Sequence, residues 1–288
     1  VGIPLFYNVG FVLLVPLKNT WQRTILLLCL PLSVLVLLNQ RDGKLRLHVL
    51  DVGQSQAIVL ERNGRAMLVD TGIEFNSGFS VAASVIEPFL NYHGLVPELA
   101  FISHGDSDHN GGRAFLSRRY PNLQWQGEGS DKPCLAGDTG YWNDLQWRVL
   151  WPAREYQDSP ALSKNNRSCV LRVQFRGFTV LLPGDIEMPA EKMLLERLRS
   201  PAEIESDVMV VPHHGSKTST SWPLLQAVDA DIYLISYGRH RGYRFPHRYT
   251  LERLARKNRP WLGTMKSGQL TIVSDGSTWS LELPFENR

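Results

Sequence analysis

Short apolar runs, bounded by Gly, Asp, Asn and Pro, recur along the chain from residue 45 onward. Runs of this length are typical of buried β-strands, whereas longer stretches near 80–92 and over 189–199 predict helices. We expect strands at 45–52, 56–61, 65–70, 99–103, 147–151, 169–175, 178–182 and 207–211. The stretch 127–145 is rich in Gly, Asp and Pro and predicts a loop. This order of elements predicts an α/β protein in which two sheets lie between layers of helices.

Two uncharged stretches precede these strands, at residues 1–17 and 24–38, with Lys18 and Arg23 between them. Each is shorter than the roughly 20 residues that a membrane span needs, so either one alone could be a buried helix or a signal-like segment. Two together, separated by a basic loop, favour the end of a helical membrane region. Because the first residue is valine, we also expect the chain to be a fragment or a processed product.

The segment after the strand at 99–103 is rich in metal-binding side chains. It reads His104-Gly105-Asp106-Ser107-Asp108-His109-Asn110-Gly111. Alternate side chains of an extended segment point the same way, so His104 and Asp106 can bind one ion, and Asp108 and His109 on the next turn can reach a second. These ligands suit Zn or Mn, and paired ions about 3.5 to 4 Å apart are usual for phosphodiester hydrolysis. The alternative is a polar turn with solvated histidines.

This run resembles the His-x-His-x-Asp-His motif of the metallo-β-lactamase superfamily, with Asp106 in place of the second histidine. The Asp form is similar to the C-terminal domain of the ComEC-type competence proteins, which internalise DNA. Further segments of that family follow in order: Leu50–Gln54, Val69–Gly72, Pro183–Asp185, Val211–Ser216, Pro246-His247 and Asp275-Gly276. The resemblance implies a four-layer αββα metallo-β-lactamase sandwich over 41–288, and a membrane-associated end of a channel region over 1–40.

The resemblance also implies roles for individual residues. Asp185 would bridge two ions, and His213, rather than His214, would complete the second ion's ligands. The expected metal ligands are therefore His104, Asp106, Asp108, His109, Asp185 and His213. Asp70, Asn166 and Ser168 would lie behind the ligands and orient them, although Asp70 could equally start a tight turn. Catalysis would depend on Asp108, Lys217 and His214, the last two facing the substrate phosphate together with Ser216.

Three departures from the family pattern limit how far the family's residue roles apply to this chain. Gln56 stands where relatives usually have Asp, and Met265 stands where they tend to have Asp. The usual third histidine has no counterpart, and the Asn-rich segment 165–168 takes its place. Since an amide is a weak metal ligand, one of the two ions is expected to be loosely held or supplied only with substrate.

The distribution of charge along the chain predicts a class of substrate without reference to the family. The whole chain carries a net charge of only +3, but nine basic residues and one acidic residue, Glu252, lie between residues 232 and 273. Tyr237, Tyr243, Phe245 and Tyr249 alternate with these arginines, which is typical of single-stranded nucleic-acid binding. We expect Ser216, Lys217, Arg239, Arg241, Arg244 and His247 to contact DNA. The alternative is a basic face toward anionic lipid or solvent.

These observations favour a nuclease with two divalent ions, Mn or Zn, that degrades the non-transported strand during DNA uptake. The domain would face the periplasm or the cell exterior at the inner membrane, beside a channel-forming part of the same or a neighbouring polypeptide. One alternative is a catalytically weak domain that binds and guides DNA, and another is a superfamily hydrolase for a small ester or thioester. The three cysteines do not decide the compartment, because Cys134 and Cys169 could pair or stay reduced.

Overall fold

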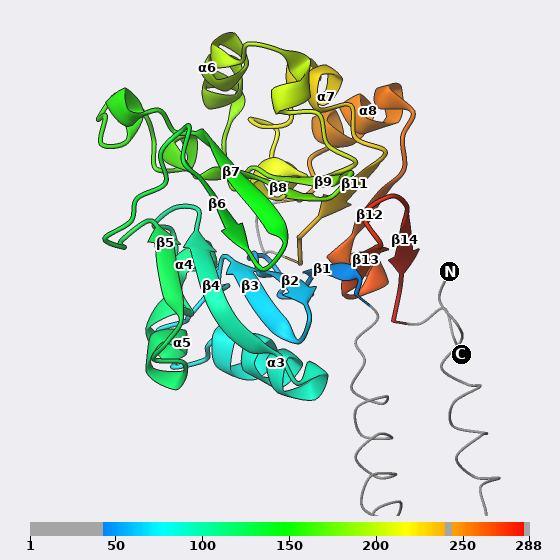
Figure 1. Ribbon diagram of the computed structural model, residues 1–288. Coiled ribbons are helices and arrows are strands. Elements are labelled where there is room, and N and C mark those ends of the chain that lie inside the picture. The colour runs from blue at the N-terminus through cyan, green and yellow to red at the C-terminus, as the bar shows by residue number, and fades with distance from the viewer. Residues whose placement is uncertain (1–42, 240–243, 285–288) are drawn as a thin grey trace, which may run out of the picture. The chain divides into compact units, whose positions relative to one another are not determined.

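The computed structural model describes residues 43–239 and 244–284 of the 288-residue chain (Figure 1). The chain divides into two compact units between Asp42 and Gly43, and all described residues lie in the second unit. None of the helices within these ranges has the length and apolar character that a membrane crossing requires. The apolar stretches 1–17 and 24–38 lie outside the described residues, so the membrane region over 1–40 stays a prediction.

The first sheet has seven strands in the order β14-β13-β1-β2-β3-β4-β5. The strands are β1 (Leu45–Val49), β2 (Ile58–Arg62), β3 (Arg65–Val69), β4 (Val96–Ile102), β5 (Gln124–Gly127), β13 (Leu270–Ser274) and β14 (Trp279–Glu282). Strands β3, β4 and β5 are parallel to one another, and the other pairs are antiparallel. The first and the last strands of the domain thus meet in one sheet, where β1 pairs with β13.

The second sheet also has seven strands, in the order β12-β11-β10-β9-β8-β7-β6. The strands are β6 (Thr139–Trp142), β7 (Leu145–Trp151), β8 (Val170–Phe175), β9 (Phe178–Leu182), β10 (Val208–Val210), β11 (Ile232–Ile235) and β12 (Trp261–Gly263). Strands β9 to β12 run parallel, whereas β6 to β9 form an antiparallel meander. Both sheets are therefore mixed.

Helices cover the outer face of each sheet (Figure 1). The helices are α3 (Glu87–His93), α4 (Ser107–Asn110), α5 (Arg113–Arg119), α6 (Met188–Arg197), α7 (Trp222–Val228), α8 (Arg248–Lys257) and α9 (Thr264–Ser267). Leu90 of α3 and Leu116 of α5 pack against the first sheet. Leu194, Leu224 and Leu254, from α6, α7 and α8, pack against the second. This is the α/β arrangement of two sandwiched sheets that the sequence predicts.

The core between the sheets follows from alternation along the strands. Leu45, Leu47 and Val49 of β1 point into it, while Arg46 and His48 point to the outer face. The apolar residues of the second sheet pack against them there. Removing this apolar surface from water is the largest favourable term in folding.

The stretch 127–145 is more ordered than a plain loop. The prediction of a loop is wrong at its C-terminal end, where β6 pairs with β7. Its first part is linked by a disulfide from Cys134 to Cys169, the residue just before β8. The backbone N–H of Cys169 also donates to the carbonyl of Ser103, so this link lies next to the segment that carries His104.

Candidate metal centre

The expected ligands gather because the strands that precede them are parallel. His104 and Asp108 follow β4, and Asp70 follows the neighbouring parallel strand β3. In the other sheet, Asp185 follows β9, and the histidine pair follows the parallel strand β10. Carboxyl ends of parallel strands meet at one edge, so loops distant in sequence reach the same place.

The loops adopt backbone conformations that few residues tolerate. Asp70, His213 and His214 have positive φ angles of 62°, 52° and 53°. Each such residue costs about 1 to 3 kcal/mol and persists only where the surrounding structure enforces it. Gly184 also has positive φ, and a Cβ there would lie 2.9 Å from the Cβ atoms of both Ser103 and Ser168. The glycine therefore lets the Asp185 loop approach the other two segments.

Asp70 organises the centre from behind. It is buried, and its carboxylate accepts hydrogen bonds from the Ser103 backbone N–H (2.8 Å), the Ser103 hydroxyl (2.9 Å) and the Gln56 amide (2.9 Å). The same carboxylate lies 2.7 Å from Nδ1 of His109. Asp70 thereby fixes the orientation of His109, as partners of metal-binding histidines commonly do.

Three imidazoles are each fixed through Nδ1, which leaves Nε2 for another partner. His109 Nδ1 donates to Asp70, and His104 Nδ1 donates to the Ser103 hydroxyl at 3.0 Å. His214 Nδ1 donates to the carbonyl of Ser236 at 2.9 Å. The Nε2 atoms of His104, His109 and His214 are buried without a hydrogen-bond partner. Metal-binding histidines commonly have one ring nitrogen fixed by such a hydrogen bond, which leaves the other nitrogen for the ion.

One group of four residues brings its ligand atoms within 4.8 Å of one another: Asp108, His109, Asp185 and His214. Oδ1 of Asp185 lies 3.2 Å from Nε2 of His109, and Oδ2 of Asp108 lies 3.4 Å from Nε2 of His214. Oδ1 of Asp185 is also buried without a hydrogen-bond partner. Two imidazole nitrogens and two carboxylates are a donor set that fits Zn or Mn. The residues present therefore fit a divalent cation.

The electrostatics of this group favour a bound cation. Burial raises the pKa of Asp185, but the neighbouring His109 and His214 outweigh burial and hold that pKa well below its ordinary value. Burial likewise raises the pKa of Asp108, and His214 and His109 bring it below the ordinary value. Burial lowers the pKa of both His109 and His214, but Asp185 in turn outweighs burial and raises the pKa of each above its ordinary value. Positive charge thus balances the two carboxylates, and a divalent cation can supply it in place of the imidazole protons.

The structure places the two adjacent histidines differently from the sequence prediction. His214, expected to face substrate, belongs to the four-residue group. His213, expected to be the ligand, is partly exposed, and its Nε2 lies 3.8 Å from Oδ2 of Asp185 and 3.4 Å from the amide nitrogen of Asn165. The physical reason is the positive φ at both positions, which turns the two side chains apart, with their ring centroids 6.5 Å apart.

The residues expected to hold the other ion are arranged more loosely. Nε2 of His104 lies 3.7 Å from Oδ2 of Asp106. The Asp106 side chain is 40% exposed, and its other oxygen lies 3.5 Å from the ammonium of Lys164. Neither belongs to the four-residue group.

Asn165 lies beside His213, whereas Asn166 of the same segment forms its hydrogen bonds away from the four-residue group. Asn166 donates to Ser163 and to Glu187, and its carbonyl oxygen accepts from the Glu187 backbone. The Ser168 hydroxyl accepts from the backbone N–H of Asp185 at 3.2 Å. Ser168 thus supports the Asp185 loop from behind, whereas Asn166 supports the loop that carries Glu187.

A pocket of about 640 Å³ adjoins the histidine pair. Its lining consists of Glu187, His213, Ser216, Lys217, Thr218, Arg244, Phe245 and His247. Five of the residues predicted from the resemblance and the charge pattern therefore share one pocket. Arg239 is exposed and does not line it, and Arg241 lies outside the described residues.

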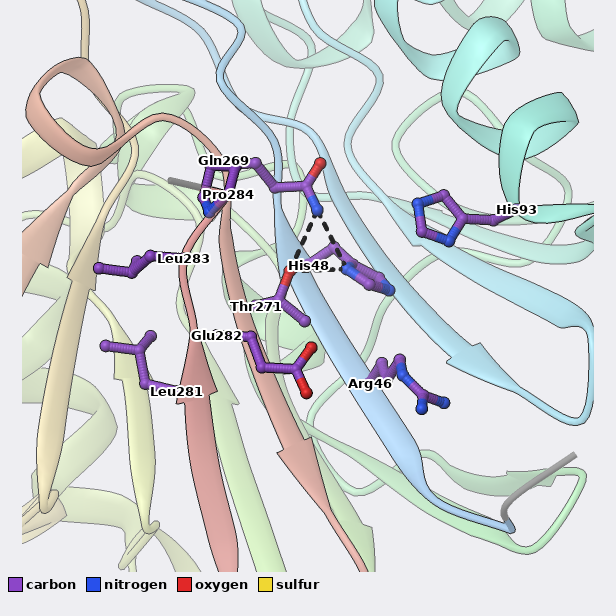
Figure 2. Close-up of a pocket in the computed structure, with 9 residues that line it drawn as sticks. All are labelled: Arg46, His48, His93, Gln269, Thr271, Leu281, Glu282, Leu283 and Pro284. Atoms are coloured by element: carbon purple, nitrogen blue, oxygen red, sulfur yellow. Dashed lines mark hydrogen bonds between the residues drawn. The ribbon is translucent and has the colours of Figure 1, made fainter. Parts of the chain in front are cut away.

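A second pocket, of about 490 Å³, lies on the outer face of the first sheet (Figure 2). Its polar wall is a network in which Gln269 donates to the Thr271 hydroxyl and His48 Nδ1 lies 2.9 Å from that hydroxyl. His48 Nε2 lies 3.1 Å from Oε2 of Glu61. These polar groups are partnered with one another, in contrast to the unpaired atoms of the metal centre.

The sequence alone does not identify several residues of the centre. Ser103 and Gln56 hold Asp70, and Glu187 accepts from Asn166 and from the Thr218 hydroxyl at 2.6 Å. Gln56 is the position where a departure from the family pattern casts doubt on the site, yet its buried amide is part of the support for His109. A single serine, glutamine or glutamate carries no spacing signal that marks such a role.

The chain is similar in sequence and in fold to known proteins. Residues 50–156 match the model of the Metallo-beta-lactamase superfamily. The uncharacterized protein YcaI of Escherichia coli is 34% identical over 96% of this chain and 37% of its own length. Recombination protein 2 of Haemophilus influenzae is 35% identical over 86% of this chain and 31% of its own length. Competence protein ComA of Neisseria gonorrhoeae is 29% identical over 80% of this chain and 32% of its own.

The chain spans about a third of the length of these relatives. Among solved structures, the metallo-β-lactamase fold protein YhfI of Bacillus subtilis aligns with a TM-score of 0.55 at 11% identity. That alignment covers 81% of this chain and all of YhfI, so the two share a fold.

Proposed function

We propose that this chain is a metal-dependent phosphodiesterase that cleaves DNA, because residues 50–156 match the Metallo-beta-lactamase superfamily and the chain is similar to a competence protein. The observation that carries the proposal is the convergence of ligand atoms of Asp108, His109, Asp185 and His214, of which those of the last three are buried without a hydrogen-bond partner. These atoms lie beside a pocket that contains Lys217 and Arg244. A cation site next to basic side chains suits a phosphodiester.

In this proposal, Asp108, His109, Asp185 and His214 would hold one ion, and His104 and Asp106 would hold a second, more weakly. A bound Mn or Zn ion supplies Lewis acidity that activates water and neutralises charge on the phosphate. The protein contributes the fixed positions of these ligands, which Asp70, Ser103 and Ser236 hold through hydrogen bonds. No protein nucleophile is required.

The pocket residues would bind and orient the substrate. The Lys217 ammonium and the Arg244 guanidinium provide positive charge for the phosphate, and Ser216 provides a hydroxyl. His213 lies between the metal ligands and these groups, 3.8 Å from Asp185 and 3.7 Å from Glu187. We assign His213 to contact with the substrate and His214 to metal binding, the reverse of the sequence-based assignment.

The names of the relatives support a biological setting for this activity. We propose that the DNA is a single strand, the one not transported during uptake for natural transformation, as the name of the competence relative supports. The partners would then be the membrane and a channel-forming part of the same or a neighbouring polypeptide, with the domain facing the periplasm or the cell exterior. The disulfide between Cys134 and Cys169 supports that side of the membrane, since disulfides persist in oxidising compartments.

The test incubates the purified chain with end-labelled single-stranded DNA and Mn or Zn. Asp108→Ala removes one ligand of the four-residue group, EDTA removes the ion, and Glu196→Ala on the exposed surface of α6 serves as the matched control. Cleavage by the wild type and by the control, lost with Asp108→Ala and with EDTA, supports the proposal. Retained DNA binding without cleavage by the wild type would instead indicate a domain that guides DNA.

A further inference from the structure

The pocket beside the metal centre opens toward the start of α8. His247 lines the pocket and caps this helix, because its Nδ1 accepts from the backbone N–H of Tyr249 at 3.3 Å. Tyr249 follows on the first turn with 47% of its surface exposed. By contrast Tyr237, which the sequence pattern groups with it, is buried at 3%. Tyr249 is thus an aromatic ring that the fold leaves about half exposed next to the pocket.

Aromatic rings continue from the centre to this tyrosine. The Phe245 ring lies 6.3 Å from that of His213 and 6.4 Å from that of His214, measured between centroids. Phe245 and His247 line the same pocket, and the His247 and Tyr249 rings are 4.9 Å apart. The series leads from the metal ligands through the pocket to α8.

Positive charge follows the same direction. The Arg248 guanidinium lies 4.8 Å above the Tyr249 ring and donates to its hydroxyl at 3.1 Å. At the opposite end of α8, Lys257 pairs with Asp229 at 2.5 Å, and Arg259 beyond it pairs with Asp231 at 3.2 Å. Within residues 43–239 and 244–284, Lys217, Arg244 and Arg248 form no ion pair of this kind. The basic side chains at the pocket and at the start of α8 are therefore among those available for phosphates.

We propose that Tyr249, with Arg248 and His247 beside it, is a stacking platform for an unpaired nucleobase of the bound strand. The inference rests on the proposed function, because it takes the scissile phosphate to lie at the metal centre. A base in a duplex has both faces covered by its neighbours, whereas an unpaired base can place one face on an aromatic ring. The platform would therefore select single-stranded over double-stranded nucleic acid.

The experiment measures steady-state cleavage of a single-stranded oligonucleotide and of its duplex by the full chain. Tyr249→Ala removes the ring, Tyr249→Phe keeps it, and Tyr141→Ala removes a tyrosine that is even more exposed, on β6 at the edge of the second sheet. Stacking contributes enough per base that KM for the single strand should rise about 10-fold in Tyr249→Ala. KM for Tyr249→Phe and Tyr141→Ala should equal the wild-type value. Preference for the single strand should fall only in Tyr249→Ala.

A small diester, bis(p-nitrophenyl) phosphate, separates this inference from the proposed function. It reaches the metal centre without reaching α8, so its hydrolysis should be equal in all four proteins. If the wild type hydrolyses neither this diester nor DNA with Mn or Zn, the proposed function fails, and anisotropy of a labelled oligonucleotide still tests the platform. Equal oligonucleotide KM or affinity for wild type and Tyr249→Ala overturns the platform. The platform is also overturned if Tyr249→Ala loses binding to anionic phosphatidylglycerol vesicles without any loss of DNA binding.

Discussion

At the scale of single residues, the adjacent pair His213 and His214 has the sharpest division of roles. We expect His214→Asn to lower metal affinity at least 10-fold, because it removes one of four ligand atoms within 4.8 Å of one another. His213→Asn should keep metal binding and lower cleavage. Asparagine is chosen because it tolerates the positive φ at both positions. Calorimetric titration with Mn or Zn measures the affinity, and an equal loss in the two variants would contradict the assignment.

Asp70 contributes to metal binding without belonging to the four-residue group. Asp70→Asn keeps the shape of the side chain but removes the negative charge that faces Nδ1 of His109 at 2.7 Å. We expect a 10- to 100-fold loss of metal affinity, the usual cost of removing such a partner. Asp131→Asn, at an exposed position, is the control. Unchanged affinity, measured by the same titration, would show that Asp70 only terminates the strand.

The residues of the centre differ in how far the sequence reveals them. His104, Asp108, His109 and Asp185 stand in motifs whose spacing predicts their convergence, although their roles as ligands stay predictions. The choice between His213 and His214 depends on backbone angles that no spacing encodes. Supporting residues such as Gln56 reach the centre by tertiary packing alone, so the sequence gives them no signal.

At the scale of elements, the disulfide joins the loop after β5 to the start of β8 across 35 residues. Removing it with Cys134→Ser and Cys169→Ser should lower the free energy of unfolding by about 3 to 4 kcal/mol, since the bond restricts the unfolded chain. Denaturant unfolding of the double variant and of the wild type, each with and without dithiothreitol, measures this. Dithiothreitol should destabilise only the wild type. Identical unfolding curves for the wild type and the double variant without dithiothreitol would contradict a formed disulfide.

The contact between β1, β2 and α3 should make stability depend on pH. Burial lowers the pKa of His93, and His48 lowers it further. Burial raises the pKa of Glu61, but the hydrogen bond from His48 brings it below its ordinary value. A depressed pKa on either group means that the unfolded chain binds protons more readily, so stability is present above the ordinary value and is lost on acidification.

For His93 the loss begins as pH falls below about 6.5, and for Glu61 it follows below about 4.3. We expect the melting temperature of His93→Gln to fall less between pH 7.5 and pH 5.5 than that of the wild type. Thermal unfolding followed by circular dichroism at each pH measures the difference. Parallel pH profiles for both proteins would exclude His93 as a titrating group.

The strands missed by sequence reasoning share one physical property, which does not extend to the missed helix α5. Strands β5 and β6 are four residues each, and β6 includes Gly140, whose position leaves no room for a Cβ against Trp147. Both strands lie at the edges of their sheets, where one neighbour suffices and apolar alternation is weak. The buried strands β4 and β9 have continuous apolar runs and are predictable from sequence.

At the scale of the whole molecule, two pairs of basic residues differ in their surroundings. Lys217 and Arg244 line the pocket, whereas Lys257 and Arg259 pair with Asp229 and Asp231. If DNA binds at the pocket, Lys217→Gln with Arg244→Gln should flatten the dependence of log K on log salt by roughly 1.4, about 0.7 for each lost phosphate contact. Lys257→Gln with Arg259→Gln should leave the slope nearly unchanged. Fluorescence anisotropy across salt concentrations measures both, and equal slopes for the two double variants would place the DNA elsewhere.

The pairing of β1 with β13 brings together residues that are more than two hundred positions apart, such as Leu47 and Ile272. During synthesis, β1 leaves the ribosome with only one of its two neighbours available, and the second arrives almost last. Until then the outer edge of β1 is an open template for pairing with other chains. Such high contact order slows folding, so the nascent domain would depend on chaperones or on slow release to reach the native sheet.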